Sequence, residues 1–131
     1  MNPNDLRYSE THEWARVEET PNGKVATVGI TAFAVELLTD LVHIELPNVG
    51  TAVQAGQPFG EVESVKSVSD LNSPVDGEVI EVNDAIVDHL ETLSNDPFGE
   101  GWLVKVKIAD EAGLAQLMDH AAYEAQCREH E

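Results

Sequence analysis

The sequence predicts a mainly β fold, a flattened β-barrel or sandwich with short flanking helices and a C-terminal helix. Two observations predict it. Short segments of alternating apolar and polar residues recur along the chain, with turn-forming residues between them. Helical periodicity is confined to the margins and to the C-terminal end. With 131 residues, 42% of them apolar, the chain can bury a hydrophobic core, and we expect residues 1–131 to form one domain.

The first predicted element is a β-hairpin. Ala15 and Val17 alternate with charged residues, and residues 20–23 (Thr-Pro-Asn-Gly) are a strong turn signal. Residues 25–30 return as the second strand. Thr31 follows, and threonine is a common N-cap residue, so we expect a short helix over residues 32–38.

A strand over residues 42–46 follows, and Pro47 ends it. Its apolar residues alternate with His43 and Glu45, so we expect them to share one face: Val42, Ile44 and Leu46. Residues 57–64 and 67–71 then predict a second hairpin.

The remaining elements are shorter or more apolar. Residues 78–82 carry apolar side chains on both faces, which favours a buried strand, and residues 84–90 favour a short helix. Residues 102–108 alternate as a final strand. A helix then repeats apolar residues at helical spacing on a face that we expect to cover the core: Leu114, Leu117, Met118, Ala121, Ala122 and Ala125.

Lys66 is the most informative residue of the chain. It is one of four lysines and lies at the tip of the second predicted hairpin, among acidic and small residues. An exposed lysine on a rigid tip suits covalent attachment of a cofactor arm. The alternative is an ordinary solvated lysine, which is what most lysines are.

The charge balance narrows the classes of partner. Seven basic residues against 25 acidic ones give a net charge of −18, which disfavours nucleic acids and anionic membranes. The acidity either steers the protein towards basic partners or serves solubility alone. The N-terminal residues lack a targeting pattern, so we expect a cytoplasmic protein, or a mitochondrial one if a transit segment was removed.

Other candidate sites are weaker. Cys127 is a single cysteine with no accompanying base, so we interpret it as a helix thiol and not as a nucleophile. His12, His43 and His89 with Glu45 lack the spacing of a metal site. The sequence therefore predicts no catalytic residue and no metal ligand. Trp14 and Trp102 are interpreted as core or cleft walls.

Six segments, in this order, resemble the H proteins of the glycine cleavage system, a family of lipoyl carriers. They are residues 11–14 (THEW), 26–31 (ATVGIT), 44–50 (IELPNVG), 60–70 (GEVESVKSVSD), 73–83 (SPVDGEVIEVN) and 95–103 (NDPFGEGWL). The resemblance implies a lipoyl/biotinyl-type fold and lipoate attached to Lys66 through an amide. Biotin carriers use a similar hairpin but typically flank the lysine with methionines, whereas Val65 and Ser67 flank it here.

The resemblance also implies a function. The protein would be a non-catalytic shuttle that carries the aminomethyl group of glycine on its lipoyl-lysine arm. Its partners would be a pyridoxal-phosphate glycine decarboxylase, a tetrahydrofolate-dependent aminomethyltransferase, a dihydrolipoyl dehydrogenase and lipoylating enzymes, and we expect a monomer. The alternatives are an H-like lipoyl relay for another pathway and an unmodified acidic interaction module.

The loaded arm needs protection from water, and hydrogen-bond acceptors in a cleft would provide it. Their place in the matched segments makes Glu13 and Asp70 the arm-cleft candidates, with Thr11 as a weaker one. The alternative has Glu13 as a solvated strand residue and Asp70 as a turn former. Two positions depart from the family pattern near the cleft: Thr39 replaces a glycine, and no histidine lies near Leu37.

Overall fold

The computed structural model describes residues 6–9, 12–21, 23–31, 34–35, 41–65, 67–96, 99–110 and 117–129. The predictions for Thr11, Leu37, Thr39 and Lys66 lie outside these ranges. The strands are β1 (Arg7–Tyr8), β2 (Glu13–Thr20), β3 (Gly23–Ile30), β4 (Leu41–Glu45), β5 (Ala52–Val53), β6 (Pro58–Ser64), β7 (Val68–Asn72), β8 (Asp76–Val82) and β9 (Val104–Asp110). The helices are the 3-10 helix η2 (Asp84–Val87), α2 (Glu91–Asn95) and α3 (His120–Glu129).

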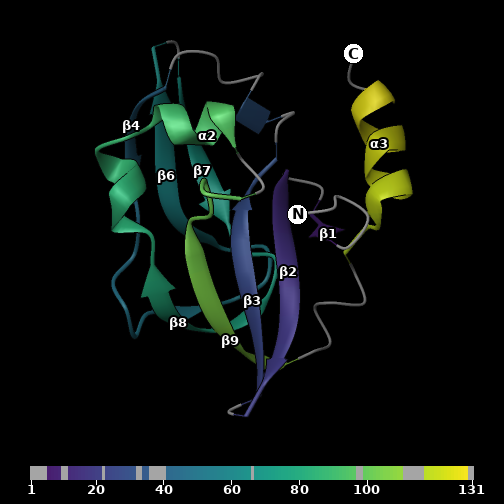
Figure 1. Ribbon diagram of the computed structural model, residues 1–131. Helices are drawn as coiled ribbons and strands as arrows, with labels where there is room; N and C mark the ends of the chain where they lie inside the picture. Colours follow the sequence, from purple (N-terminus) through teal and green to yellow (C-terminus); the bar gives the residue numbers. More distant parts are fainter. Residues whose placement is uncertain are drawn as a thin grey trace.

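The strands form two antiparallel sheets, which confirms the predicted mainly β fold (Figure 1). The larger sheet has the order β1-β2-β3-β9-β8-β5, and the smaller one has the order β4-β6-β7. Every described strand pair is antiparallel. The first predicted hairpin is β2–β3, and the second is β6–β7.

The main core is built by the alternate apolar residues of both sheets. Val28, Val79 and Val106 from the larger sheet and Val62 and Leu71 from the smaller one are at most 1% exposed. Burial of side chains from both sheets in one cluster is the arrangement of a sandwich. The β6–β7 hairpin is thus held to the molecule by its inner face.

A second, aromatic cluster joins the two ends of the chain. Tyr8 of β1 exchanges backbone hydrogen bonds with Met118 just before α3, at 2.8 and 2.7 Å. Leu6, Trp14 and Tyr123 pack into the same cluster. Figure 1 accordingly shows α3 beside β1, on the side of the molecule away from β6 and β7.

The predicted face of the C-terminal helix is only partly right: Leu117 and Met118 pack against the two hydrophobic clusters, but the alanines do not. Met118 is held in the bridge to Tyr8, so α3 begins only at His120. Ala121, Ala122 and Ala125 are exposed, and Tyr123 is the residue that the helix buries. Leu114 lies outside the described residues.

Two further predictions about strand faces are wrong: Val42 does not share the buried face with Ile44, and Ile80 is exposed. The register shifts between Leu41 and His43, and Val42 is 51% exposed while Ile44 is buried. A bulge interrupts the regular alternation of side chains, which the sequence pattern alone assumes. Ile80 is 41% exposed for another reason: it follows buried Val79 in regular alternation, so its side chain lies on the outer face of β8, which is not buried as predicted.

The short helical segments partly confirm the predictions. Thr31 accepts a hydrogen bond from the Ala34 amide at its side-chain oxygen, 3.2 Å away, as an N-cap residue does. The helix expected over residues 84–90 is a 3-10 turn, Asp84–Val87, and a separate α2 follows it. Within the described residues, no helix is long and apolar enough to cross a membrane.

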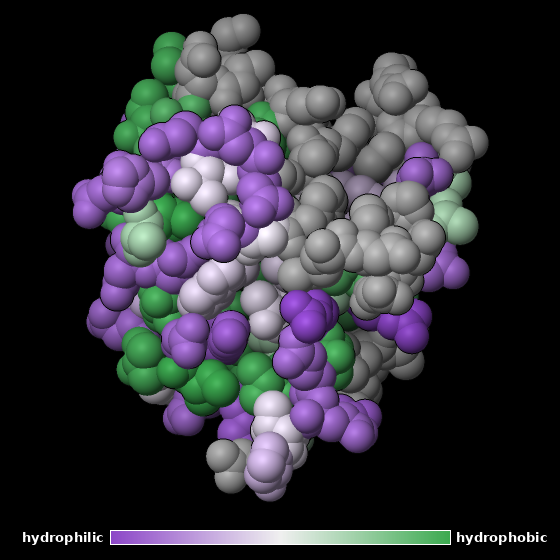
Figure 2. Space-filling view, viewed as in Figure 1, coloured by the Kyte–Doolittle hydropathy of each residue, from purple (hydrophilic) through white to green (hydrophobic). Residues whose placement is uncertain are grey.

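The surface mixes hydrophilic and apolar residues. Figure 2 shows hydrophilic side chains over much of the coloured face, with apolar ones gathered in its lower part, where Figure 1 places β8 and β9, and at its upper left edge. Ile80 of β8 is among the exposed apolar residues. An exposed apolar residue such as Ile80 is common on protein surfaces and carries no function by itself.

Candidate functional site

The turn of the β6–β7 hairpin is closed by two serines. The Ser64 amide donates to the Ser67 carbonyl at 2.8 Å, and the Ser67 amide donates to the Ser64 hydroxyl at 3.2 Å. Ser64 is only 3% exposed, so its hydroxyl ties the turn to the buried side of the hairpin. Lys66 itself lies outside the described residues, but the turn that contains it is fixed on both sides.

The residues next to Lys66 point into solvent. Val65 is 68% exposed, Ser67 is exposed, and Val68 is 57% exposed. Two exposed valines beside one turn are costly in water, because each leaves apolar area uncovered. The tip of the hairpin is therefore accessible and partly apolar.

The outer face of the small sheet is acidic. Glu45, Glu61 and Asp70 lie directly opposite one another on β4, β6 and β7. In the next row, His43 lies opposite Glu63, and Glu63 lies opposite Val68. Among the described residues, no ion pair offsets these carboxylates, so they leave a concentrated negative charge on the sheet that carries the hairpin.

An open groove runs along this acidic row. Its volume is about 410 Å³, and the three carboxylates of the row line it together with half-buried Leu46 and Phe59. Asp70 is thus an exposed strand residue of β7, and its interpretation as a turn former is wrong.

Glu13 lies in a different environment. Its side chain is 2% exposed, and its Oε1 accepts a hydrogen bond from the Ser9 hydroxyl at 2.8 Å. The Glu13 amide donates to the same hydroxyl at 3.1 Å, and the Ser9 amide donates to the Glu13 carbonyl at 2.9 Å. The interpretation of Glu13 as a solvated strand residue is therefore wrong.

The structure separates the two carboxylate candidates. Glu13 begins β2 in the larger sheet, whereas Asp70 lies on the outer face of the smaller one. Thr11 lies outside the described residues. Sequence reasoning missed Ser9 and Tyr123, which contact this region. The polar partner of a buried carboxylate leaves no signal in sequence periodicity.

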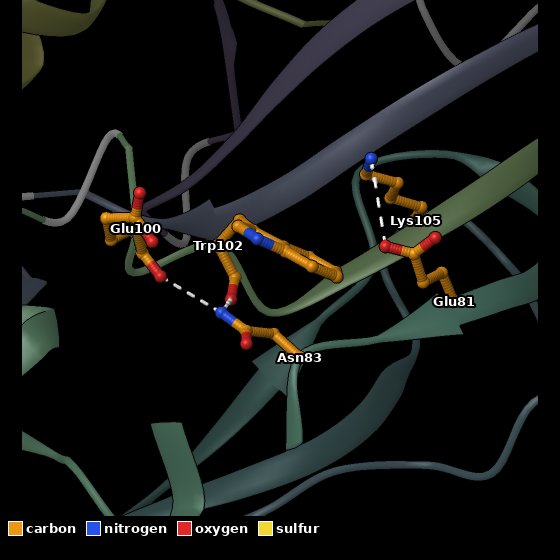
Figure 3. Close-up of polar contacts among 5 residues, drawn as sticks. All are labelled: Glu81, Asn83, Glu100, Trp102 and Lys105. Atoms are coloured by element: carbon orange, nitrogen blue, oxygen red, sulfur yellow. Dashed lines mark hydrogen bonds and ion pairs between the residues drawn. The ribbon is translucent and has the colours of Figure 1, made fainter. Parts of the chain in front are cut away.

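The loop after α2 is attached to β8 by one amide side chain. Asn83 Nδ2 donates to the carbonyls of Glu100 at 3.0 Å and of Trp102 at 2.8 Å (Figure 3). The Lys105 ammonium lies 5.3 Å from the centroid of the Trp102 ring and 3.8 Å from Glu81. Asn83 also lines a cavity of about 340 Å³ with His89, Asp96 and Glu100.

The histidines occupy separate places. His12 contacts Tyr123, His43 lies on the outer face of β4, and His89 lies 3.4 Å from Glu91. In the part of the chain that the structure describes, no group of three potential metal ligands gathers. Cys127 lies in α3.

Comparison with known proteins agrees with this arrangement. The model of the glycine cleavage H-protein family matches residues 6–130. The chain belongs to this family. It is 54% identical over 128 residues to the glycine cleavage system H protein of Rhodopirellula baltica, covering 97% of this chain and 96% of that protein. It is 54% identical to that of Rubrobacter xylanophilus, covering 91% of each chain.

A solved structure shows the same fold. The glycine cleavage system H protein from Mycobacterium marinum superposes with a TM-score of 0.86 at 44% identity, covering 95% of this chain and 98% of that one. The predicted family and fold class are thereby confirmed. The family is the lipoyl carrier of the glycine cleavage system, and that is the function of this chain.

Proposed function

We propose that Lys66 is the attachment site of lipoate, through an amide on its Nζ. The observation that carries this proposal is the closed turn around it, with Ser64 and Ser67 hydrogen-bonded at 2.8 Å and exposed neighbours on either side. A ligase can reach such a tip, and a fixed turn limits the directions in which an attached arm extends. The residues around Lys66 therefore fit the group that the family carries.

When bound, lipoate would supply a dithiolane that accepts, carries and releases the one-carbon unit. This chain would contribute tethering, which raises the local concentration of the arm at each partner. It would also lose one positive charge on amide formation. Since Lys66 is the only lysine or arginine between Lys24 and Lys105, the β6–β7 hairpin would then carry no lysine or arginine charge.

Glu13 is the acceptor that we propose for the cationic amine of the cargo, with Asp70 and Thr11 as the other two candidates. A buried carboxylate in a water-poor setting stabilises a cation more strongly than an exposed one does. Ser9 holds the Glu13 carboxylate through Oε1. Burial of Glu13 and exposure of Asp70 make Glu13 the stronger candidate of the two.

The chain would itself be non-catalytic, in agreement with its family. Its partners would be glycine decarboxylase, aminomethyltransferase, dihydrolipoyl dehydrogenase and the lipoylating enzymes, and it would act as a cytoplasmic monomer forming one domain. The acidic row of the small sheet would attract partners whose docking surfaces are basic, because complementary charge steers association. Val65 and Val68 would add apolar contacts at the tip.

The intact mass of protein expressed with lipoate available tests the attachment site. We expect one lipoyl group, mapped to the peptide that contains Lys66 and absent from Lys66→Arg. Lys107→Arg, at an exposed lysine of β9, is the matched control and should stay fully lipoylated. Unmodified protein, in cells where a known carrier is lipoylated, would refute the proposal, and a biotin adduct would assign a different carrier chemistry.

A further inference from the structure

One hydroxyl of α3 joins two segments that lie far from it in the sequence. The Tyr123 hydroxyl lies 2.7 Å from His12 Nδ1 and 2.6 Å from the Thr31 hydroxyl. Tyr123 is only 5% exposed, and its ring stacks on Tyr8 with centroids 4.7 Å apart and planes 9° apart. The stacked rings fix where the hydroxyl lies, so the two contacts are held in place by packing.

The two segments flank one cross-strand pair. Glu13 of β2 lies opposite Ile30 of β3. His12 immediately precedes Glu13, and Thr31 immediately follows Ile30. The Thr31 amide donates to the His12 carbonyl at 3.0 Å, so backbone and side-chain contacts close the end of the hairpin together. Tyr123 thus contacts both residues that border the Glu13–Ile30 pair.

His12 needs such support, because its backbone is strained. Its φ of 73° lies in the left-handed region, which costs a residue with a Cβ about 1 kcal/mol or more. The turn carries the chain from Ser9, whose carbonyl accepts from the His12 amide at 3.1 Å, back to Glu13. If His12 relaxed, the direction of the Glu13 side chain relative to Ser9 would change with it.

The two contacts of the Tyr123 hydroxyl can form with either tautomer of His12. With Nδ1 unprotonated, Tyr123 donates to His12 and accepts from Thr31. With Nδ1 protonated, His12 donates to Tyr123, which donates in turn to Thr31. In both arrangements the phenol oxygen links the two residues.

We propose that Tyr123 is a positioning residue for the Glu13 carboxylate. Its hydroxyl fixes His12 and Thr31, and these fix the end of the hairpin from which Glu13 projects. The consequence for the cargo rests on the role proposed above for Glu13. The placement of Glu13 by Tyr123 does not rest on it, so the two can be tested separately.

The first test is amide hydrogen exchange in Tyr123→Phe, which keeps the stacked ring and removes the hydroxyl. We expect the Glu13 and Thr31 amides to exchange about fivefold faster, the size of one lost hydrogen bond. The Val79 amide, bonded to Thr51 at 2.9 Å on β8, should be unchanged. Tyr8→Phe removes the other hydroxyl of the stacked pair, keeps both contacts of Tyr123, and should leave the Glu13 and Thr31 amides unchanged. Equal acceleration at all three amides, or none, would overturn the proposal.

The second test is the rate at which a labelled one-carbon unit is lost from the loaded carrier. We expect Tyr123→Phe to speed the loss several-fold, and to add nothing in a Glu13→Gln background. An additive effect, or an unchanged rate where Glu13→Gln is effective, overturns the proposal. If Glu13→Gln itself changes nothing, the cargo role of Glu13 fails, and the exchange experiment alone decides the role of Tyr123.

Discussion

The indole ring of Trp14 lies against Gly29, its partner across the β2–β3 hairpin. A Cβ on Gly29 would come within 2.6 Å of three indole atoms, including Nε1. Trp14 is fully buried, and its Nε1 donates to the Ile30 carbonyl at 3.1 Å. Gly29 is therefore required for space and not for an unusual φ.

Gly29→Ala should lower the free energy of unfolding by about 1–3 kcal/mol, because the indole has no free space into which to move. Urea denaturation measures it. The penalty should shrink in a Trp14→Leu background, where the ring is absent, so a double-mutant cycle gives a clear coupling energy. Equal penalties in both backgrounds would show that the indole is not the cause.

Glu61→Gln should stabilise the folded chain by roughly 0.5 kcal/mol. Glu61 lies between Glu45 and Asp70, and like charges directly opposite one another on neighbouring strands repel. The gain should fall as salt is added, since exposed charges are screened. Glu81→Gln is the matched control: Glu81 lies 3.8 Å from Lys105, so its neutralisation should bring no gain. A gain of equal size there would contradict the explanation.

Asn83→Ala should lower the free energy of unfolding by about 1–2 kcal/mol, because two carbonyls would lose a donor. Asn83→Asp should be at least as harmful, although it keeps the shape of the side chain. A carboxylate facing the Glu100 and Trp102 carbonyls has no proton to donate. Thermal denaturation of both variants checks this, and a harmless Asn83→Asp would refute the assigned hydrogen bonds.

Alkaline pH should destabilise the protein through Tyr8. Burial, and then the negative charge of Glu124, raises the pKa of Tyr8 from 10.0 to about 12. Below pH 10 the phenol is neutral in both states. Between about pH 10 and 12, the unfolded chain releases a proton that the folded chain keeps, so the free energy of unfolding falls by up to about 3 kcal/mol.

Tyr8→Phe removes this titration and should flatten that part of the stability profile. Urea denaturation at several pH values from 9 to 12, in both proteins, measures the difference in slope. Identical slopes would show that another group causes the loss.

The sequence predicts the elements that depend on periodicity. The β2–β3 and β6–β7 hairpins are confirmed, because alternation and turn residues act locally. The prediction for Val42 is wrong, since a β-bulge shifts the register of β4 there without a sequence mark. The prediction for Ile80 is wrong because two apolar faces in the sequence do not show that both are covered. Lys66 was identified by its neighbours and its place in a hairpin, and its attachment role stays a prediction.

Periodicity does not predict the contacts of the aromatic cluster that joins the two ends of the chain. The sequence predicts a helix whose alanines cover the core. Instead, Met118 pairs with Tyr8 before the helix begins, and Tyr123 is the residue of α3 that is buried. Likewise, the burial of Glu13 depends on Ser9 and on a left-handed His12. Both depend on contacts between distant segments, which periodicity does not encode.

The bridge between Tyr8 and Met118 also imposes an order on biosynthesis. Residues 118–123 leave the ribosome 46 to 51 positions after Asn72, the last residue of the β6–β7 hairpin. The lysine turn, closed by local hydrogen bonds, can therefore form on a growing chain before Tyr123 exists to fasten His12. A nascent or C-terminally shortened chain would then carry the closed turn before the contacts of Tyr123 with His12 and Thr31 could form.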